Sequence, residues 1–292
     1  MHKIYEFNNQ IINEDCLEGL KNIPDDSADV IIIDPPYNIG KDFGNNKDSM
    51  DINEYITWTM QWFRECYRIL KPNGLGYIYG FSEILAHIST KIDLKKQRWL
   101  IWHYTNKVTP GLKFWQRSHE SIICFWKDKP HFNIDDVRVP YTENFIKNSA
   151  GKKRTSTKCR FNSDPNYQSY YTPHEKGALP KDVFEISALA GGKALQERYF
   201  YCKTHNIFCN PKQRRDHDEC DIIIHPTQKP MDLTRKLIMA SRPKGRKFNV
   251  LIPFCGSGSE CYVTKEMGGN YLSFEINPDY IKLAENIVNL IK

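Results

Sequence analysis

The feature that most constrains the fold of this chain is a run of apolar, β-branched residues, Val30–Ile33, which ends directly in Asp34-Pro35-Pro36-Tyr37. A strand that is apolar at every position has no face left for water, so such runs are typical of a parallel sheet covered by helices on both faces. Short apolar runs recur at residues 248–252 and 270–275, separated by a segment of helical pattern. We therefore predict an α/β fold with a doubly wound, mainly parallel sheet that binds ligands at the carboxyl ends of its strands.

Predicted strands and helices alternate in the first and last parts of the chain. Strands are expected at residues 10–13, 29–33, 76–80, 99–104, 121–126, 248–252 and 270–275. Helices are expected at residues 17–20, 52–70, 82–90 and 231–240, from about residue 258, and at 278–291. The strands that end at Ile33 and Ile252 are predicted to lie side by side, so that the motifs following them share one cleft.

The regular pattern stops between about residues 130 and 221. This stretch is polar and basic, and glycines and prolines interrupt it throughout. It is too long for a plain loop, so we interpret it as an insertion. The sequence therefore predicts three parts, with boundaries at 1–130, 131–221 and 222–292.

Composition indicates an ordinary globular protein. With 292 residues, 26% charged and 40% hydrophobic, the chain is long enough to bury a large core. Its apolar runs are too short to span a bilayer, and its first residues lack the apolar core of a signal peptide, so we expect a soluble, cytoplasmic protein with no membrane contact. Nine cysteines in such a protein should be mostly reduced.

The net charge of +6 is modest but unevenly distributed. Residues 144–163 contain six basic and no acidic side chains, and residues 242–247 contain four basic side chains. Such a block can attract phosphate groups, and the alternative is a solvated loop. The candidates for phosphate contacts are Lys152, Lys153, Arg154 and Lys158.

Asp34-Pro35-Pro36-Tyr37 follows its strand where an open α/β sheet places its active site. Prolines carry no backbone N–H, so the carbonyl groups here are free to accept hydrogen bonds. An ionised Asp34 is an acceptor only, and with a proline carbonyl it can hold both hydrogens of one amino group. Tyr37 offers a flat face against which a base can stack. The tetrapeptide has the chemistry to bind a planar amine, and the alternative is a rigid turn at a strand end.

The strand at 248–252 leads into a glycine turn, Pro253–Gly258. Glycines allow the backbone to approach a ligand closely, and the helix that follows favours an anion at its amino terminus. Glu275 ends the next strand, 17 positions after Gly258, where its carboxylate can accept from the two hydroxyls of a ribose. Cys261 stands where the dinucleotide fingerprint has its third glycine, so this is a different nucleoside-binding pattern.

With these motifs in this order, the chain resembles the DNA amino-methyltransferases of adenine N6 and cytosine N4, in the group (beta class) whose catalytic motif precedes the cofactor motif. Residues 130–220 lie outside the resemblance, where the family has its variable target-recognition region. The matching segments are Asn13–Leu17, Asp34–Ile39, Leu70–Gly74, His119–Ile123, His225–Pro230, Phe254–Gly258 and Phe274–Pro278.

The resemblance implies a Rossmann-like methyltransferase fold that uses S-adenosylmethionine. Residues 1–130 would form the catalytic half, 131–221 an inserted target-recognition region, and 222–292 the cofactor-binding half. The implied activity is site-specific, direct methyl transfer to the N6 amine of a flipped-out adenine in double-stranded DNA. The implied catalytic residues are Asp34, Pro35, Pro36 and Tyr37. The implied cofactor-binding residues are Asp15, Cys16, Asp34, Thr227, Lys229, Phe254, Cys255, Gly256, Ser257, Gly258 and Glu275. The basic candidates Lys152, Lys153, Arg154 and Lys158 would contact DNA phosphates.

Two features depart from the family pattern. Ile252 stands where the family usually has aspartate, and Ser259-Glu260 follows the second glycine where threonine is usual. The isoleucine removes one polar anchor near the cofactor, so we expect weaker cofactor binding with the activity retained.

Other functions remain open at this stage. A cytosine N4 methyltransferase would use the same amine-binding chemistry, although that group usually has serine in place of Asp34. An RNA adenine methyltransferase and a DNA-binding module without activity are further alternatives. A cognate restriction endonuclease and a homodimer are candidate partners, and the recognised DNA sequence cannot be read from the chain.

The resemblance does not explain Cys202-x2-His205-x3-Cys209 followed by His217-x2-Cys220. These spacings can supply four zinc ligands, which would stabilise a segment with little core of its own. The alternative is a basic loop that contains cysteine and histidine for other reasons. No metal is included among the predicted sites.

Overall fold

The computed structural model of the chain describes residues 4–44, 48–106, 109–155, 164, 168–190 and 192–291. It divides into two compact units, one formed by Met1–Phe132 with Asp182–Lys292 and the other by Asn133–Lys181. The predicted insertion at 131–221 therefore contains two different parts, because residues 182–221 belong to the larger unit. The functional boundaries proposed from the sequence stay a prediction.

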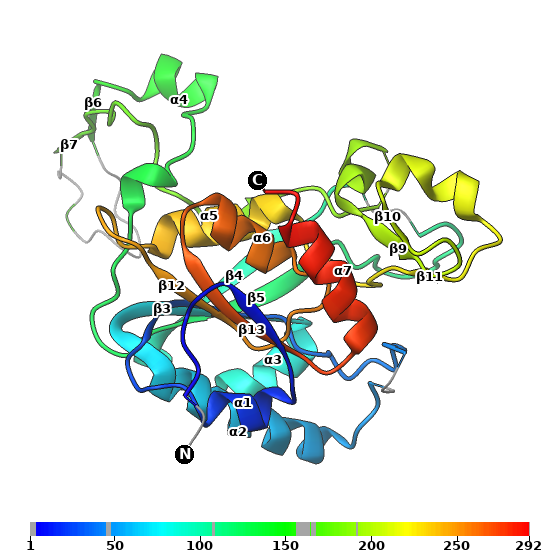
Figure 1. Cartoon of the computed structure of the whole chain (residues 1–292). Coiled ribbons are helices and arrows are strands. Elements are labelled where there is room, and N and C mark those ends of the chain that lie inside the picture. The colour runs from blue at the N-terminus through cyan, green and yellow to red at the C-terminus, as the bar shows by residue number, and fades with distance from the viewer. Residues whose placement is uncertain are drawn as a thin grey trace. The chain divides into compact units, whose positions relative to one another are not determined.

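An eight-stranded sheet in the order β1-β13-β12-β2-β3-β5-β4-β8 forms the centre of the larger unit (Figure 1). Its strands are β1 (Gln10–Asn13), β2 (Ala28–Ile33), β3 (Leu70–Gly80), β4 (Gln97–His103), β5 (His119–Phe125), β8 (Val183–Glu185), β12 (Asn249–Ile252) and β13 (Asn270–Glu275). Neighbouring strands are parallel except where β5 pairs with β3 and β4. The predicted mainly parallel α/β sheet is confirmed.

The two predicted motif-bearing strands are neighbours. β12 pairs in parallel with β2, with Val250 opposite Val30 and Leu251 opposite Ile31. From β2 the chain passes through α2 (Ile52–Ile69) to β3 on one side, and from β12 through α6 (Ser259–Glu266) to β13 on the other. The carboxyl ends of β2 and β12 thus flank the topological switch point, where open α/β sheets bind their ligands.

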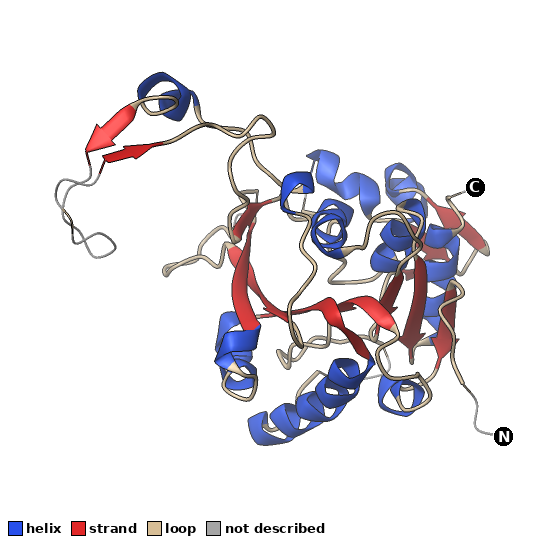
Figure 2. Cartoon of the chain, turned by 90° about the vertical axis from the view of Figure 1, so that its left-hand side faces the viewer, coloured by secondary structure: helices blue, strands red, loops and turns tan. Residues whose placement is uncertain are grey.

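Helices cover the sheet on both faces (Figures 1 and 2). One layer contains α1 (Cys16–Leu20), α2 and α3 (Ser82–Ser89), and the other contains α5 (Met231–Ser241), α6 and α7 (Pro278–Val288). The side chains of β2 alternate between the layers, Val30 and Ile32 packing in one core and Ile31 and Ile33 in the other. All four are completely buried, each contributing about 1.5–3 kcal/mol relative to an exposed position.

The start of β3 differs from the prediction. Helix α2 ends at Ile69, as Pro72 and Gly74 predict, but the strand begins at Leu70 rather than at Gly76. The pairing with β2 contains a register shift between Ala28 and Val30, which accommodates the extra residues. Such a bulge depends on the partner strand and is not visible in the local sequence.

A small three-stranded sheet, β10-β9-β11, also belongs to the larger unit. It consists of β9 (Phe200–Cys202), β10 (Ile207–Cys209) and β11 (Ile222–Ile223), with the 3-10 helix η4 (Pro211–His217) between the last two. Further 3-10 turns are η1 (Leu94–Lys96) and η3 (Gly192–Glu197). Among the described residues, no helix combines the length and apolarity that crossing a membrane requires.

The smaller unit has little hydrophobic core. It contains η2 (Ile134–Asp136), α4 (Glu143–Asn148) and the antiparallel pair β6 (Lys153–Thr155) and β7 (Gln168–Tyr170). Among the described residues of this unit, Val137 is the one large hydrophobic residue whose side chain is buried. Lys152 and Lys153 are exposed, the backbone of Arg154 lies in β6, and Lys158 lies outside the described residues.

Candidate active site

A cleft of about 230 Å³ opens where β2, β12 and β13 end, and we refer to it as the switch-point cleft. Most of the predicted catalytic and cofactor-binding residues line it: Asp15, Cys16, Asp34, Pro35, Pro36, Thr227, Lys229, Phe254, Cys255, Gly256, Ser257 and Glu275. Tyr37 and Gly258 lie outside the lining; Tyr37 contacts Asp34, and Gly258 belongs to the turn that contains Gly256. The prediction that Asp34 and Gly256 converge on one cleft is confirmed.

The carboxylate of Asp34 is held from both sides. Its Oδ2 accepts from Nζ of Lys229 at 2.9 Å, and its Oδ1 accepts from the hydroxyl of Tyr37 at 2.9 Å. The same hydroxyl lies 3.0 Å from Oε2 of Glu120, so its single proton is shared between two carboxylates. Asp34 is thereby fixed in one orientation at the end of its strand.

Lys229 is a buried cation at the centre of this group. Its side chain is only 3% exposed, and Nζ lies 3.6 Å from Glu120 and 5.0 Å from the ring centroid of Tyr37. Burial alone would lower the pKa of Lys229, but the charges of Asp34 and Glu120 outweigh it and raise that pKa above its usual value. The lysine therefore stays charged and offsets part of the negative charge of the two carboxylates.

Tyr37 supports Asp34 rather than presenting an open face in this structure. Its side chain is 8% exposed, and its ring packs edge-on against Phe81, with centroids 5.2 Å apart. Burial raises the pKa of Tyr37, so the hydroxyl keeps its proton and remains a donor. A base could stack on this ring only after the side chain had moved.

The two proline carbonyls are not equivalent. The hydroxyl of Tyr55 donates to the carbonyl of Pro36 at 2.6 Å. No hydrogen bond from the described residues reaches the carbonyl of Pro35, which lies beside Asp34 in the lining of the switch-point cleft. Pro35 is therefore the better candidate to share an amino group with Asp34.

The glycine turn requires glycine at both positions. Gly256 and Gly258 have φ angles of +53° and +82°, in the left-handed region that favours glycine. A Cβ atom on Gly256 would lie 2.9 Å from the buried ring of His225, and one on Gly258 would lie 2.8 Å from Cα of Ala284. A side chain at either position would push the turn out of place.

Glu275 joins the glycine turn to the end of β13. Its carboxylate accepts from the backbone N–H of Gly256 at 2.8 Å and from that of Asn277 at 2.9 Å. A carboxylate has about four acceptor sites, so about two remain for a ligand. Asp15 follows β1, the strand that pairs with β13; it caps α1 by accepting from the N–H of Leu17 at 2.8 Å and is exposed.

Cys16 and Cys255 are buried in the wall of the cleft. Burial raises the pKa of the Cys16 thiol, and a hydrogen bond with Cys261 together with burial raises that of Cys255. Both are therefore protonated and act as small packing residues rather than as nucleophiles.

A DNA methylase family model, that of the N6/N4 methyltransferases, matches residues 28–286. The protein belongs to this family of DNA methylases. Members of the family use S-adenosylmethionine as methyl donor.

The alignments with individual relatives cover nearly the whole chain. The Type II methyltransferase M.HpaI of Haemophilus parainfluenzae is 31% identical over 284 residues, covering 94% of this chain and 73% of that protein. The DNA adenine methyltransferase YhdJ of Escherichia coli (strain K12) is 29% identical over 277 residues, covering 94% of this chain and 80% of that protein.

Solved structures share the fold. The PvuII DNA methyltransferase (cytosine-N4-specific) superimposes with a TM-score of 0.62 at 15% identity, covering 98% of this chain and 87% of that chain. The complex of M1.HpyAVI with S-adenosylmethionine gives a TM-score of 0.56 at 17% identity, covering 96% and 98%. The named proteins thus include an adenine and a cytosine-N4 enzyme, so the likeness itself does not select the base.

Two acidic residues of the methylase site were not among the predicted ones. Glu260 lines the switch-point cleft and is 5% exposed; its Oε2 accepts from the hydroxyl of Ser259 at 2.8 Å, while its Oε1 has no partner among the described residues. Burial and the charge of Asp34 raise the pKa of Glu260 to about 7. The family usually has threonine after the second glycine, so Ser259-Glu260 at this place was a sequence signal that could have identified Glu260. Glu120, by contrast, carried no local signal of its contact with Tyr37.

Proposed function

We propose that this methylase transfers a methyl group from S-adenosylmethionine to the N6 amino group of adenine in double-stranded DNA. The proposal rests on one observation, that two groups of residues from distant segments line the same cleft. Asp34 and the Pro35 carbonyl form an amine acceptor, and the glycine turn with Glu275 forms a nucleoside site. Family membership implies an amino-methyltransferase of DNA, and adenine as the target base is our proposal.

The residues of the cleft fit the proposed cofactor. Glu275 retains acceptor sites for ribose hydroxyls, and Gly256 and Gly258 keep the turn free of side chains. The methionine end carries an ammonium group, for which the unpartnered Oε1 of Glu260 beside Asp34 is a suitable acceptor. We propose that Glu260 replaces the aspartate that the family usually has at Ile252. When bound, the cofactor supplies a methyl group attached to a positively charged sulfur.

Asp34 and Pro35 would orient the acceptor amine. An amino group placed between them can donate one hydrogen to the carboxylate and the other to the carbonyl. Lys229 and Tyr37 occupy one acceptor direction on each Asp34 oxygen, which leaves other directions open while keeping the carboxylate fixed. As the amine nitrogen gains positive charge, its attraction to Asp34 grows, so this contact favours the transition state over the ground state.

The target base would have to leave the DNA helix. The amino group of a paired base is buried in the duplex, and an enzyme that reacts with it extrudes the nucleotide into its pocket. Two observations support adenine over cytosine. This chain has Asp34 where cytosine N4 enzymes usually have serine, and a 29% identical relative over most of the chain is a DNA adenine methyltransferase.

The smaller unit would supply part of the DNA contact. Lys152 and Lys153 are exposed on it, and with Arg154 and Lys158 they form the basic stretch that we propose binds DNA phosphates. Three relatives are named Type II methyltransferases, which supports a companion restriction endonuclease of the same site specificity. A homodimer and a cytoplasmic location remain parts of the proposal.

Product analysis tests the proposal directly. The full-length protein is incubated with S-adenosylmethionine and unmethylated double-stranded DNA, and the DNA is digested to nucleosides for mass spectrometry. We expect N6-methyldeoxyadenosine from the wild type and almost none from Asp34→Ala. N4-methyldeoxycytidine would assign the cytosine alternative, and methylation of RNA alone would overturn the DNA substrate. Single-molecule sequencing of DNA from a methylation-free host would then identify the recognised site.

A further inference from the structure

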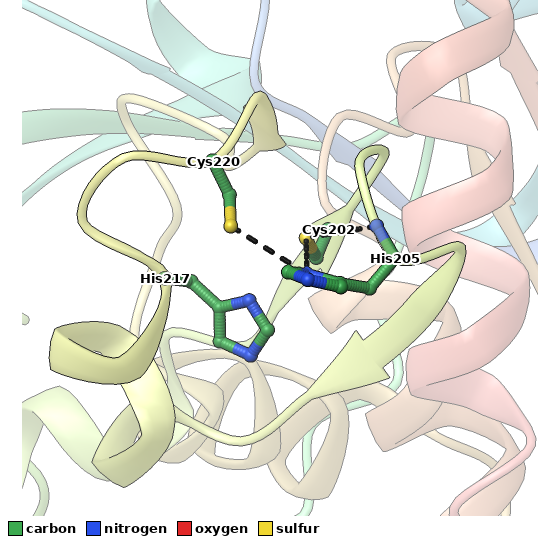
Figure 3. A group of neighbouring side chains, drawn as sticks. All are labelled: Cys202, His205, His217 and Cys220. Atoms are coloured by element: carbon green, nitrogen blue, oxygen red, sulfur yellow. Dashed lines mark hydrogen bonds between the residues drawn. The ribbon is translucent and has the colours of Figure 1, made fainter.

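Four metal-ligating side chains meet in the small sheet β10-β9-β11, outside the switch-point cleft (Figure 3). Cys202 ends β9, His205 lies in the turn to β10, His217 ends η4, and Cys220 precedes β11. One potential ligand atom from each of them lies within 4.8 Å of all the others. We call this group the Cys2His2 cluster.

The spacing inside the cluster suits a tetrahedral ion. Nδ1 of His205 lies 3.3 Å from Sγ of Cys202 and 3.5 Å from Sγ of Cys220. With zinc–sulfur and zinc–nitrogen bonds of about 2.3 and 2.0–2.1 Å, a tetrahedral site separates sulfur from nitrogen by about 3.6 Å. These two separations are close to those that one zinc ion would require, and the ligand atom of His217 lies within 4.8 Å of the other three.

The surroundings distinguish ligands from supporting residues. His217 is 6% exposed, and its Nδ1 is buried without a hydrogen-bond partner among the described residues. Its Nε2 lies 3.6 Å from Sγ of Cys209, so the second ring nitrogen has a partner of its own and Nδ1 is the nitrogen left for an ion. The backbone N–H of His205 also donates to Sγ of Cys202 at 3.4 Å, which would stabilise a thiolate. Cys209 is not part of the group of four whose ligand atoms all lie within 4.8 Å of one another, so we assign it as a neighbour of the cluster and not as a ligand.

The local fold has few other sources of stability. Its own buried core consists of Phe200, Cys202 and Cys209, and its strands contain only two or three residues each. The cysteines of the segment are free thiols, so no disulfide ties it together. Segments with so small a core usually depend on a metal ion or a covalent link.

We propose that the Cys2His2 cluster binds one structural zinc ion. The four protein ligands leave no open position for a substrate, as is characteristic of structural rather than catalytic zinc. This site is additional to the proposed methyl transfer and does not depend on the identity of the target base.

The ion would hold the segment that leads into the switch-point cleft. β11 ends two residues before His225, whose ring packs against Gly256. On the other side, Lys203 forms an ion pair with Asp279 of α7, and Lys282 of α7 lies 4.0 Å from the ring centroid of Tyr201. Zinc would thus tie this short sheet into a rigid support next to the cofactor-binding residues.

Metal analysis of the untagged, full-length protein tests the proposal. After dialysis against metal-free buffer, elemental mass spectrometry should find one zinc per chain. Cys220→Ser and His205→Ala should lose most of it, whereas Cys209→Ser, the matched control at a neighbouring thiol, should keep it. His205→Cys supplies a new thiolate at an exposed position and should restore the binding that His205→Ala loses.

Cobalt substitution provides a second readout that does not depend on yield or activity. Co2+ in the cluster should show the intense visible bands of tetrahedral coordination and a thiolate charge-transfer band, both absent in Cys220→Ser. A folded wild type that neither contains zinc nor takes up zinc or cobalt would overturn the proposal. So would a disulfide between Cys202 and Cys220, detected as the loss of two hydrogen masses. Loss of zinc from Cys209→Ser equal to that from Cys220→Ser would refute the assigned ligand set.

Discussion

Glu260→Gln gives the sharpest test of how the cleft holds its cofactor. Glu260 is buried, one of its oxygens is unpartnered, and burial with the charge of Asp34 raises its pKa to about 7. An ammonium group bound beside it would favour the ionised carboxylate. Cofactor affinity should therefore rise with pH in the wild type, because the acceptor becomes charged as pH passes through 7.

The size of the effect follows from the fraction of Glu260 that is ionised. With a pKa of about 7, roughly 9% of the carboxylate is charged at pH 6 and roughly 76% at pH 7.5. If the charged form alone holds the ammonium group, affinity should rise about eightfold, or about 1 kcal/mol, over that interval. Glutamine has nearly the same shape and no charge, so Glu260→Gln should bind more weakly at pH 7.5 and show almost no such rise.

Isothermal titration calorimetry with S-adenosylmethionine at pH 6 and 7.5 measures this dependence, and buffers of different ionisation enthalpy report the protons released. Ser259→Ala is the companion variant: it leaves the carboxylate but removes a hydrogen bond that lowers the pKa of Glu260, so the rise in affinity should persist and move to higher pH. Thermal unfolding gives an independent check. Folding raises the pKa of Glu260 from 4.5 to about 7, so the free energy of unfolding of the wild type falls by about 3 kcal/mol between pH 4 and pH values above 7. Glu260→Gln should therefore gain stability relative to wild type at pH 8 and not at pH 4. Wild-type affinity that is constant or falls with pH would refute the reasoning.

The other residues of the site have separable effects. Asp34→Ala should lower the single-turnover rate at saturating cofactor and DNA by about a hundredfold or more, and near-normal chemistry would mean that the active site lies elsewhere. Tyr37→Phe keeps the ring but removes the donor to Asp34, so we expect a smaller loss, and an equal one would contradict the supporting role. Glu275→Ala should weaken cofactor binding by about 1–3 kcal/mol in calorimetry, and unchanged affinity would argue against the ribose contact. Lys152→Ala with Lys153→Ala should reduce the salt slope of DNA binding by about 0.9 per lost contact; an unchanged slope would indicate a solvated loop.

Local signals in the sequence were sufficient for seven of the eight strands of the large sheet and for the order of the motifs, whereas β8 lies in the stretch interpreted as an insertion and was not predicted. Val30–Ile33 is apolar at every position, which only a strand covered on both faces can accommodate, and Pro35 and Pro36 end it. Gly256 and Gly258 marked a turn because their positive φ angles are costly for other residues. These effects act within a few residues of the chain, so they can be read without knowledge of the partners.

Tertiary structure alone decided which side chains meet. Nothing near Asp34 in the sequence indicates that Lys229, 195 positions away, neutralises it, or that Tyr37 turns its hydroxyl toward Asp34 and away from solvent. The spacing of five cysteines and histidines could not separate the four clustered ligands from Cys209, because the choice depends on side-chain directions across three short strands. The physical reason is the same in each case. Charge balance, burial and ligand geometry are set by packing between distant segments, whereas propensity and periodicity describe one segment at a time.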